Sequence, residues 1–125
     1  MRLVLCLLLA LAAAPAWAEW VVLAKDSLGN TYHFDPDATR VNGNFRRGWM
    51  IYDMTVPVNG ALSKRISFEH DCKEHKVKIL SETSHSEHMA EGNVLVGVAD
   101  EGPSTWLDIS PGSVSGVLGK AICAK

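Results

Sequence analysis

Residues 62–72, with the sequence LSKRISFEHDC, alternate between apolar and polar side chains, and this alternation decides the fold. In an extended strand, one side carries the apolar side chains together with a single charge, that of Lys64. These side chains belong to Leu62, Ile66, Phe68, His70 and Cys72. Serines and charged residues fill the positions between them. A period of two is typical of a strand with one buried face. Cys72 is therefore predicted to lie on the core face of a sheet.

Five further runs rich in Val, Ile, Thr and aromatic residues surround this strand along the chain, separated by turn signals such as Asn59-Gly60. Asn and Gly tolerate the positive φ angles of tight hairpins. In the next run, Val77 and Ile79 are opposed by charged residues that include Glu82. Because the connections are short, an antiparallel meander is favoured. The predicted strands are residues 20–25, 31–34, 45–56, 62–72, 75–83 and 94–98.

The C-terminal segment changes to a helical period. Its apolar residues recur at i, i+3, i+4, i+7 and i+8, which defines one helix face. They are Val114, Val117, Leu118, Ala121 and Ile122. Ser110 suits the N-cap and Pro111 the first helical position. Gly116 and Gly119 each cost about 1 kcal/mol relative to Ala, so this helix needs docking against a core. The alternative is an irregular segment over residues 111–122.

The N-terminus has the pattern of a secretory signal peptide. Arg2 precedes an unbroken apolar run over residues 3–14, and Ala16-Trp17-Ala18 supplies small residues for cleavage. Residues 1–18 are therefore predicted to be a cleaved signal peptide, and residues 19–125 a single exported domain. The protein is expected in the periplasm or outside the cell, with the cell surface as a further location. An uncleaved membrane anchor is the alternative.

Export determines the role of the cysteines. Cys6 lies inside the apolar run, so cleavage before it would leave that run attached, and we set aside a lipoprotein; the chain has no lipobox. Cys72 and Cys123 remain, and an oxidising compartment favours their pairing. The alternative is one metal-ligating cysteine and one free thiol. The predicted class is α+β: a roughly six-stranded antiparallel meander, with one C-terminal helix on its core face tied by the Cys72–Cys123 disulfide.

Composition excludes several classes of protein. Hydrophobic residues make up 47% and charged residues 21% of the chain, values that fit a globular domain rather than a disordered one. Without Arg2 the chain has 11 Lys and Arg against 14 Asp and Glu, a net charge of −3. No basic cluster marks a nucleic-acid surface. After signal cleavage, no apolar run reaches the roughly 18 residues of a transmembrane helix.

The third predicted strand has apolar side chains on both faces. Trp49 and Ile51 point one way, and a second row points the other way. That row is Met50, Tyr52, Met54 and Val56. A helix beside Cys72 is not expected to reach this row, so we predict an interface with a second copy or another protein, with Arg46 and Asp53 in its polar rim. The alternative is burial by residues 84–92 or by the first strand.

Four of the five histidines lie between residues 70 and 88, and Cys72-x-x-His75 with His85-x-x-His88 superficially resembles a zinc spacing. Cys72 is better explained by Cys123, and His85 and His88 lie in a polar stretch that is predicted to be an exposed loop. We therefore predict no metal and no cofactor in this cluster. Protease, nucleophile, P-loop and dinucleotide motifs do not occur, so no catalytic residue is predicted and the protein is expected not to be an enzyme.

Taken in order, short motifs along the chain resemble the surface-adhesin protein E family of proteobacteria. The resemblance covers about residues 20–123. The matching features are Trp20-Val21, Tyr32-x-Phe34-Asp35-Pro36-Asp37, Trp49 in a strand ending at Pro57, Glu69-x-Asp71-Cys72, Ile79-Leu80-Ser81, Met89-x-x-Gly92, Trp106, Pro111-Gly112-Ser113 and Cys123.

The resemblance implies a six-stranded antiparallel sheet with a disulfide-tied C-terminal helix. It also implies an adhesin-like protein, because the named adhesin of the family binds host extracellular-matrix and plasma proteins. The missing lipobox departs from a lipid-anchored surface protein, and no motif identifies a ligand-binding residue. The expected function is that of an exported protein-binding module of the bacterial envelope. The alternative is a periplasmic structural or envelope-maintenance protein with no host ligand.

Overall fold

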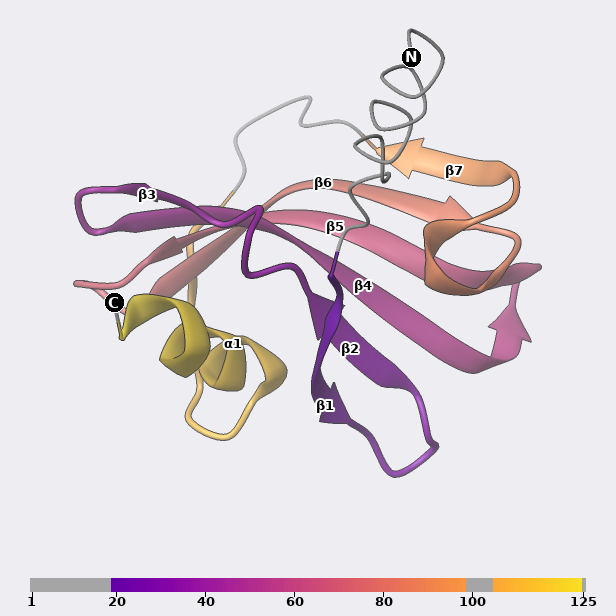
Figure 1. The fold of residues 1–125 in the computed structure, drawn as a ribbon, viewed down its shortest axis with the longest axis horizontal. Coiled ribbons are helices and arrows are strands. Elements are labelled where there is room, and N and C mark those ends of the chain that lie inside the picture. The colour runs from indigo at the N-terminus through magenta and orange to yellow at the C-terminus, as the bar shows by residue number, and fades with distance from the viewer. Residues whose placement is uncertain (1–18, 99–104, 125) are drawn as a thin grey trace, which may run out of the picture.

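The structure is a computed structural model, and it describes residues 19–98 and 105–124 (Figure 1). The predicted signal peptide, including Cys6, lies outside these residues. In the described part, eight strands form one open sheet with the path β1-β2-β4-β5-β6-β7, and every pair is antiparallel. The path strands are β1 (Val21–Lys25), β2 (Thr31–Phe34), β4 (Phe45–Val58), β5 (Ala61–Asp71), β6 (Lys76–His85) and β7 (Val94–Val98). The predicted meander is confirmed.

Three short elements were not predicted from the sequence. Strand β3 (Arg40–Asn42) pairs with β4, and strand β8 (Leu107–Asp108) pairs with the beginning of β6. A single 3-10 turn, η2 (His88–Ala90), lies between β6 and β7. Elements of two or three residues carry too little periodicity to be recognised in a sequence.

The predicted turn at Asn59-Gly60 joins β4 to β5 as a tight hairpin. Both residues adopt positive φ, 51° at Asn59 and 81° at Gly60, as a two-residue hairpin with the sheet's right-handed twist requires. Pro57 lies inside β4 rather than after it, where the pairing with β5 is irregular. A proline is tolerated there because its missing N–H breaks no regular ladder bond.

A β-bulge in β6 changes which side chains share a face. Ser67 pairs with Ser81 but Phe68 pairs with Ile79, so Leu80 is an extra residue. The period of two therefore shifts after Leu80. Glu82 pairs with Ile66 and lies on the core side of the sheet. The predicted opposition of Glu82 to Val77 and Ile79 is wrong for this reason.

The core lies between one face of the sheet and helix α1 (Val114–Cys123) (Figure 1). Its buried residues come from four strands and the helix. They are Phe34, Met50, Phe68, Val77, Leu118 and Ile122. Register explains the grouping, because Phe68 lies opposite Gly48 while His70 lies opposite Val77, all on the helix side. The predicted core face of residues 62–72 and the docked C-terminal helix are confirmed.

The helix begins three residues later than its sequence signals indicated. Ser113 is the N-cap, and its Oγ accepts a hydrogen bond from Gly116 N at 3.1 Å. Ser110 instead accepts, through its carbonyl, the bond that closes the preceding turn. Of the predicted helix face, Leu118 and Ile122 are buried whereas Val117 and Ala121 are exposed. The helix therefore contacts the sheet along a narrower stripe than predicted.

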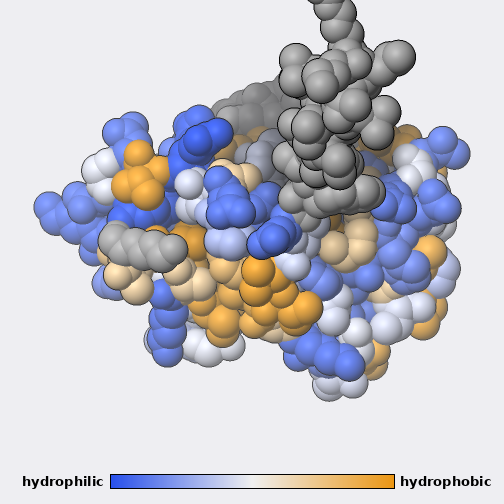
Figure 2. Space-filling view, viewed as in Figure 1, coloured by the Kyte–Doolittle hydropathy of each residue, from blue (hydrophilic) through white to orange (hydrophobic). Residues whose placement is uncertain are grey.

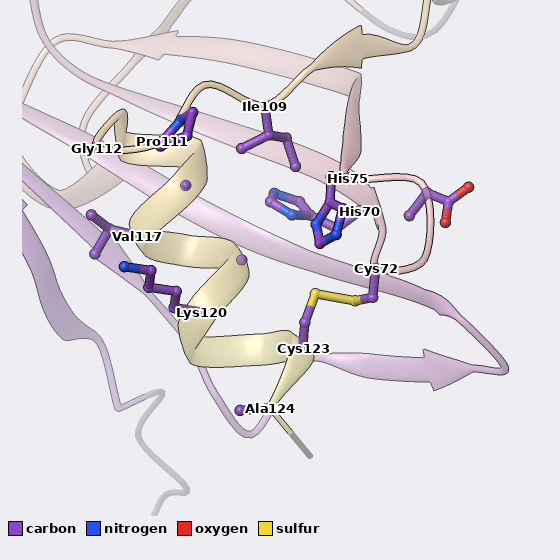
Figure 3. A pocket seen from close by; sticks show the side chains of 13 residues that line it. His70, Cys72, His75, Ile109, Pro111, Gly112, Val117, Lys120, Cys123 and Ala124 are labelled. Carbon is purple, nitrogen blue, oxygen red and sulfur yellow. A yellow bond between two sulfur atoms is a disulfide. The ribbon is translucent and has the colours of Figure 1, made fainter.

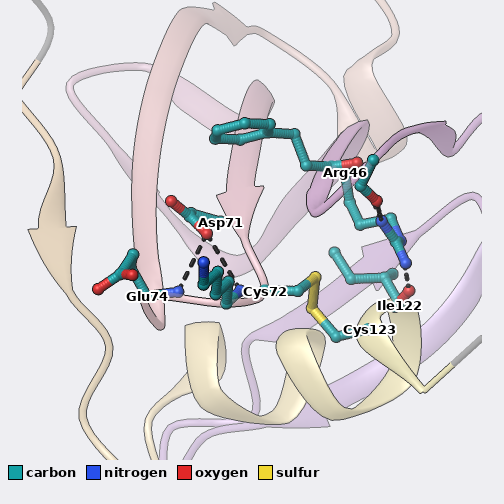
Figure 4. Close-up of a disulfide and its surroundings, with 9 residues drawn as sticks. Arg46, Asp71, Cys72, Glu74, Ile122 and Cys123 are labelled. Atoms are coloured by element: carbon teal, nitrogen blue, oxygen red, sulfur yellow. Dashed lines mark hydrogen bonds between the residues drawn. A yellow bond between two sulfur atoms is a disulfide. The ribbon is translucent and has the colours of Figure 1, made fainter.

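Three sets of bonds hold the end of α1 (Figure 4). Cys72 and Cys123 form the predicted disulfide, with their Cα atoms 5.7 Å apart. Arg46 is buried, and its Nε donates to Ile122 O at 3.1 Å, satisfying a carbonyl in the last helical turn. Asp71 Oδ1 accepts from two backbone N–H groups just beyond Cys72, at 3.0 Å each, and so fixes the turn that carries this cysteine.

The two helix glycines are expected to respond oppositely to substitution by alanine. A Cβ at Gly116 would lie 2.8 Å from the backbone Ser110 O, so Gly116→Ala must move the chain and should destabilise the protein by about 1–3 kcal/mol. A Cβ at Gly119 would meet His70 at an ordinary 3.5 Å, so Gly119→Ala should stabilise by up to about 1 kcal/mol through helix propensity. Urea unfolding of both variants measures the difference. Equal shifts of the same sign would contradict it.

Candidate binding sites

The four residues of the predicted interface row do not share one environment. Met50 and Met54 are buried, with 7% and 4% of their surface exposed, whereas Val56 is 68% exposed. Met50 packs in the same cluster as Leu118 and Ile122, so the expectation that the helix does not reach the row is wrong for this residue. The helix covers the face of β4 that is set by the pairing of β4 with β5. Because β4 has apolar side chains on both faces, its sequence does not indicate which face that is.

Tyr52, the fourth member of the row, belongs to a partly buried polar contact. Its ring stacks on that of Tyr32, with centroids 4.6 Å apart, and its hydroxyl accepts a bond from Asn30 Nδ2 at 3.0 Å. The pKa of Tyr32 is raised, mainly because the residue is partly buried and secondly because Tyr52 lies next to it. Asn30 also donates to Asp26 Oδ2 at 3.0 Å. These bonds hold the β1–β2 turn against β4.

The opposite face of β4 and β5 anchors the connection that contains η2. Asp53 Oδ1 accepts from Met89 N at 2.9 Å and contacts His88 Nδ1 at 3.1 Å. Ser63 is fully buried; its hydroxyl donates to Glu87 O and accepts from Ala90 N at 2.8 Å. Neither the predicted rim residue Asp53 nor buried Arg46 borders an exposed row. Asp53 instead positions this connection.

Exposed apolar side chains gather at the end of the sheet where β4 turns into β5. We call this set the apolar tip. It comprises Val56, Val58, Val94, Leu95 and Val96, which are 44–68% exposed. The side chain of Leu95 on β7 reaches the β4–β5 turn, since a Cβ at Gly60 would lie 3.9 Å from Leu95 Cδ1. Strand β7 is also the last strand on its side of the described sheet.

A second apolar patch covers α1 and β1 in the space-filling view (Figure 2). The exposed apolar residues of these elements are Val21 and Val22 on β1 and Val117 on α1. Among the described residues, no helix is long and apolar enough to cross a membrane.

The fold does not assemble the residues of the zinc-like spacing into a metal-ligating group within the described part of the chain. Cys72 is bonded to Cys123 and therefore cannot act as a thiolate ligand. The predicted exposed loop is wrong for His85, because β6 extends to this residue and buries it. His85 shares a hydrogen bond with Thr83 Oγ1 at 2.7 Å, and burial together with the charge of Arg65 lowers its pKa. His75 is exposed at the β5–β6 turn. No group of three or more metal-ligating side chains occurs within the described ranges, and the absence of bound zinc stays a prediction.

A pocket of about 820 Å³ lies beside the disulfide, between α1 and the end of β5 (Figure 3). Ile109 and Pro111 line one end of it, and Cys123 and Ala124 line the other. His70 lines it as well, with none of its surface exposed. Neither ring nitrogen of His70 has a hydrogen-bond partner among the residues that the structure describes. Burial lowers the pKa of His70 to about 4, so its ring is neutral at neutral pH.

Sequence reasoning placed His70 on the core face but did not single it out as a site residue. Two signals were present: a histidine at an apolar position of an alternating strand, and the pair Gly116 and Gly119 one turn apart on a helix. What connects them is the docking of α1. A Cβ at Gly119 would lie 3.5 Å from His70 Nδ1, so this edge of the ring faces the helix.

His70 is expected to make stability depend on pH below neutrality. The unfolded chain takes up a proton at this residue near pH 6.5, but the folded protein only near pH 4. Stability is therefore fully present above pH 6.5 and falls as the pH is lowered, by up to about 1.4 kcal/mol per pH unit. Urea unfolding at pH 7 and pH 5 should show a smaller loss for His70→Phe than for wild type. His75→Gln, an exposed control, should keep the wild-type loss; equal losses in all three proteins would contradict the assignment.

The architecture defines a class of protein: an open antiparallel sheet with one C-terminal helix tied to its core face by a disulfide. A sequence model of the family described as surface-adhesin protein E matches residues 20–124. The chain belongs to this family, and it is an adhesin-like domain. No curated protein matches the chain in sequence.

Solved structures of Haemophilus influenzae protein E have a similar fold. Crystal form II of that protein has a TM-score of 0.65 and 15% sequence identity, and the match covers 88% of this chain and 91% of that one. Protein E from non-typeable Haemophilus influenzae has a TM-score of 0.65 and 14% identity, covering 89% of this chain and 79% of that one. At such identities the likeness shows the fold alone.

Proposed function

We propose that the chain is an exported, non-enzymatic protein-binding module of the bacterial envelope. Residues 1–18 act as its signal peptide and residues 19–125 form the binding domain. Family membership supports the adhesin-like class. The signal-like N-terminus and the disulfide support export, because such bonds persist in oxidising compartments.

The apolar tip is the observation that carries the proposed binding role. Soluble domains tolerate single exposed apolar residues, but neighbouring groups of them mark contact sites. Val94, Leu95 and Val96 are consecutive on β7, so both faces of this strand offer apolar contact. Val56, the one member of the predicted row that is exposed, lies on β4 near the β4–β5 turn.

Strand β7 adds a second means of attachment. Within the described sheet no strand pairs with its outer edge, so the backbone groups there are available to a partner. An extended segment of another protein that adds to this edge gains main-chain hydrogen bonds, while alternate side chains contribute specificity. The partner is thus a protein with an extended, partly apolar segment, from the host or the envelope, or a second copy of this chain.

Binding is tested with Val94→Lys/Val96→Lys, which places charges on the apolar tip without changing buried residues. Binding of the purified exported protein to a panel of matrix and plasma proteins, and its self-association by light scattering, are measured for wild type and variant. The variant should lose at least tenfold in whichever affinity is found and keep its melting temperature. Val41→Lys on β3 is the matched exposed control and should bind as wild type does. Equal binding by all three proteins would remove the tip from the proposal.

Location separates this function from a structural role in the periplasm. Protease added to intact cells should digest a surface module, whereas a periplasmic protein is cut only after the outer membrane is opened. A wild-type protein that is protected in intact cells and binds neither itself nor the panel would favour the envelope-maintenance alternative.

A further inference from the structure

We propose that the pocket between α1 and the end of β5 is a second binding site, for a small, neutral, mainly apolar ligand whose single hydroxyl bonds to His70. This site is separate from the apolar tip, because His70 lies near the last residue of β5 and the tip lies at its first residue. The proposal therefore does not depend on the tip binding a protein.

The pocket has the size and lining of a small-molecule site. Its volume of about 820 Å³ falls within the range typical of ligand pockets. Most of its wall is apolar or without side chains: Ile109, Val117, the glycines of α1 and the disulfide itself. An apolar ligand would be stabilised there by the contact surface that it removes from water.

His70 is the polar group that points to a particular ligand chemistry. Burying a polar group without a hydrogen bond costs free energy, so buried polar atoms without partners are uncommon and call for an explanation. Both nitrogens of His70 are buried without partners among the described residues. A neutral imidazole offers one N–H donor and one acceptor nitrogen. A hydroxyl, which both donates and accepts, can pair with either nitrogen whichever tautomer is present.

The helix has a glycine, Gly119, where it packs beside the ring of His70. The Nδ1–Cε1 edge of His70 faces Gly119, where a Cβ would lie 3.5 Å from Nδ1 and 3.7 Å from Cε1. Gly119 also lines the pocket. A methyl group here would stand beside the ring nitrogen without disturbing the fold. The glycine that weakens the helix thus leaves no side chain beside this buried nitrogen.

Charge argues for a neutral ligand. His70 is uncharged at neutral pH and offers no counter-ion to a buried carboxylate or ammonium group. The charged side chains that line the pocket are Asp71 and Lys120, which have opposite signs. Burial of an ion beside a neutral ring would carry a desolvation cost that one hydrogen bond does not offset.

The test compares three probes on the exported, oxidised protein: 4-ethylphenol, ethylbenzene and 4-ethylbenzoate. Affinities are measured by two-dimensional NMR titration, and the imidazole nitrogens of His70 are followed in the same samples. We expect 4-ethylphenol to bind saturably, to shift pocket resonances and those of His70, and to bind about tenfold more tightly than ethylbenzene, the gain of one buried hydrogen bond.

Two variants separate a ligand site from a merely structural histidine. His70→Phe should bind 4-ethylphenol and ethylbenzene equally. Gly119→Ala should weaken 4-ethylphenol binding at least tenfold while its melting temperature stays at or above that of wild type, a combination that a structural role does not produce. Lys120→Gln is the control and should leave phenol binding unchanged.

Three results would overturn the proposal. The first is no saturable binding of 4-ethylphenol at millimolar concentration. The second is tighter binding of 4-ethylbenzoate that Lys120→Gln abolishes, because the pocket would then select an anion. The third is unchanged phenol binding in His70→Phe, which would leave an apolar pocket without the proposed hydrogen bond.

Discussion

Removal of the Cys72–Cys123 disulfide is expected to lower the melting temperature by well over 10 °C. The bridge closes a loop across 51 positions, and limiting that loop in the unfolded chain contributes roughly 4 kcal/mol. A domain of about 100 residues shifts by about 4–8 °C for each kcal/mol. Removal of the disulfide should destabilise α1 more than the strands, because α1 has only 10 residues and two of them are glycines. So short a helix is unstable in isolation.

Calorimetry of the oxidised protein, the reduced protein and Cys72→Ser/Cys123→Ser measures this effect. Reductant should have no effect on the double variant, which controls for its action elsewhere. Amide exchange should accelerate in α1 more than in β4 and β5. Thiol labelling of the unreduced, denatured exported protein should find no free thiol. Two reactive cysteines in that assay would contradict the disulfide.

Phe68→Ala is expected to cost about 3–5 kcal/mol, the usual effect of removing a buried aromatic ring. Phe68 is only 1% exposed and lies at the centre of the core. Its ring meets that of His70 edge to face, with centroids 5.3 Å apart. It also fills the space left by Gly48 on β4, where a Cβ would lie 2.9 Å from the ring. The space left by truncation is therefore bordered by two strands and cannot easily close.

Urea unfolding of the oxidised protein measures the cost, with Phe45→Ala as the matched control. Phe45 lies on β4 and is 39% exposed, with Trp106 as its aromatic neighbour. Its truncation should cost about 1 kcal/mol, because less apolar surface is returned to water. If the two variants lose the same stability, Phe68 does not occupy the centre of the core.

Strand positions were predictable from the sequence wherever alternation and turn residues agreed. Residues 31–34 and 94–98 were predicted with the bounds that the structure has. The long strands were placed to within one or two residues. Pairing followed, since short connections between consecutive strands leave little choice but hairpins. The disulfide was predictable from the sequence too, because Cys72 on the core face and Cys123 at the end of an amphipathic helix must meet the same core.

The faces of the strands were less predictable. The bulge at Leu80 reverses the alternation within β6, and no residue type at this position indicates a bulge. On β4, both faces carry apolar side chains, so local alternation cannot distinguish the core face from the other face. Met50 was therefore predicted to lie on a face that the helix does not reach. Only the pairing of Gly48 with Phe68 reveals which face α1 covers.

The sequence by itself determined the six strands of the main sheet path, their antiparallel order, the docked helix, the cysteine pair and the family, because each follows from local spacing or from short motifs. The tertiary structure alone decided which side chains stay exposed and which polar groups are buried without partners. The apolar tip combines residues from β4 and β7, and the pocket combines His70 with Gly119, which lie 49 positions apart in the sequence. Such sites depend on contacts between segments far apart in sequence, and local periodicity carries no information about those contacts.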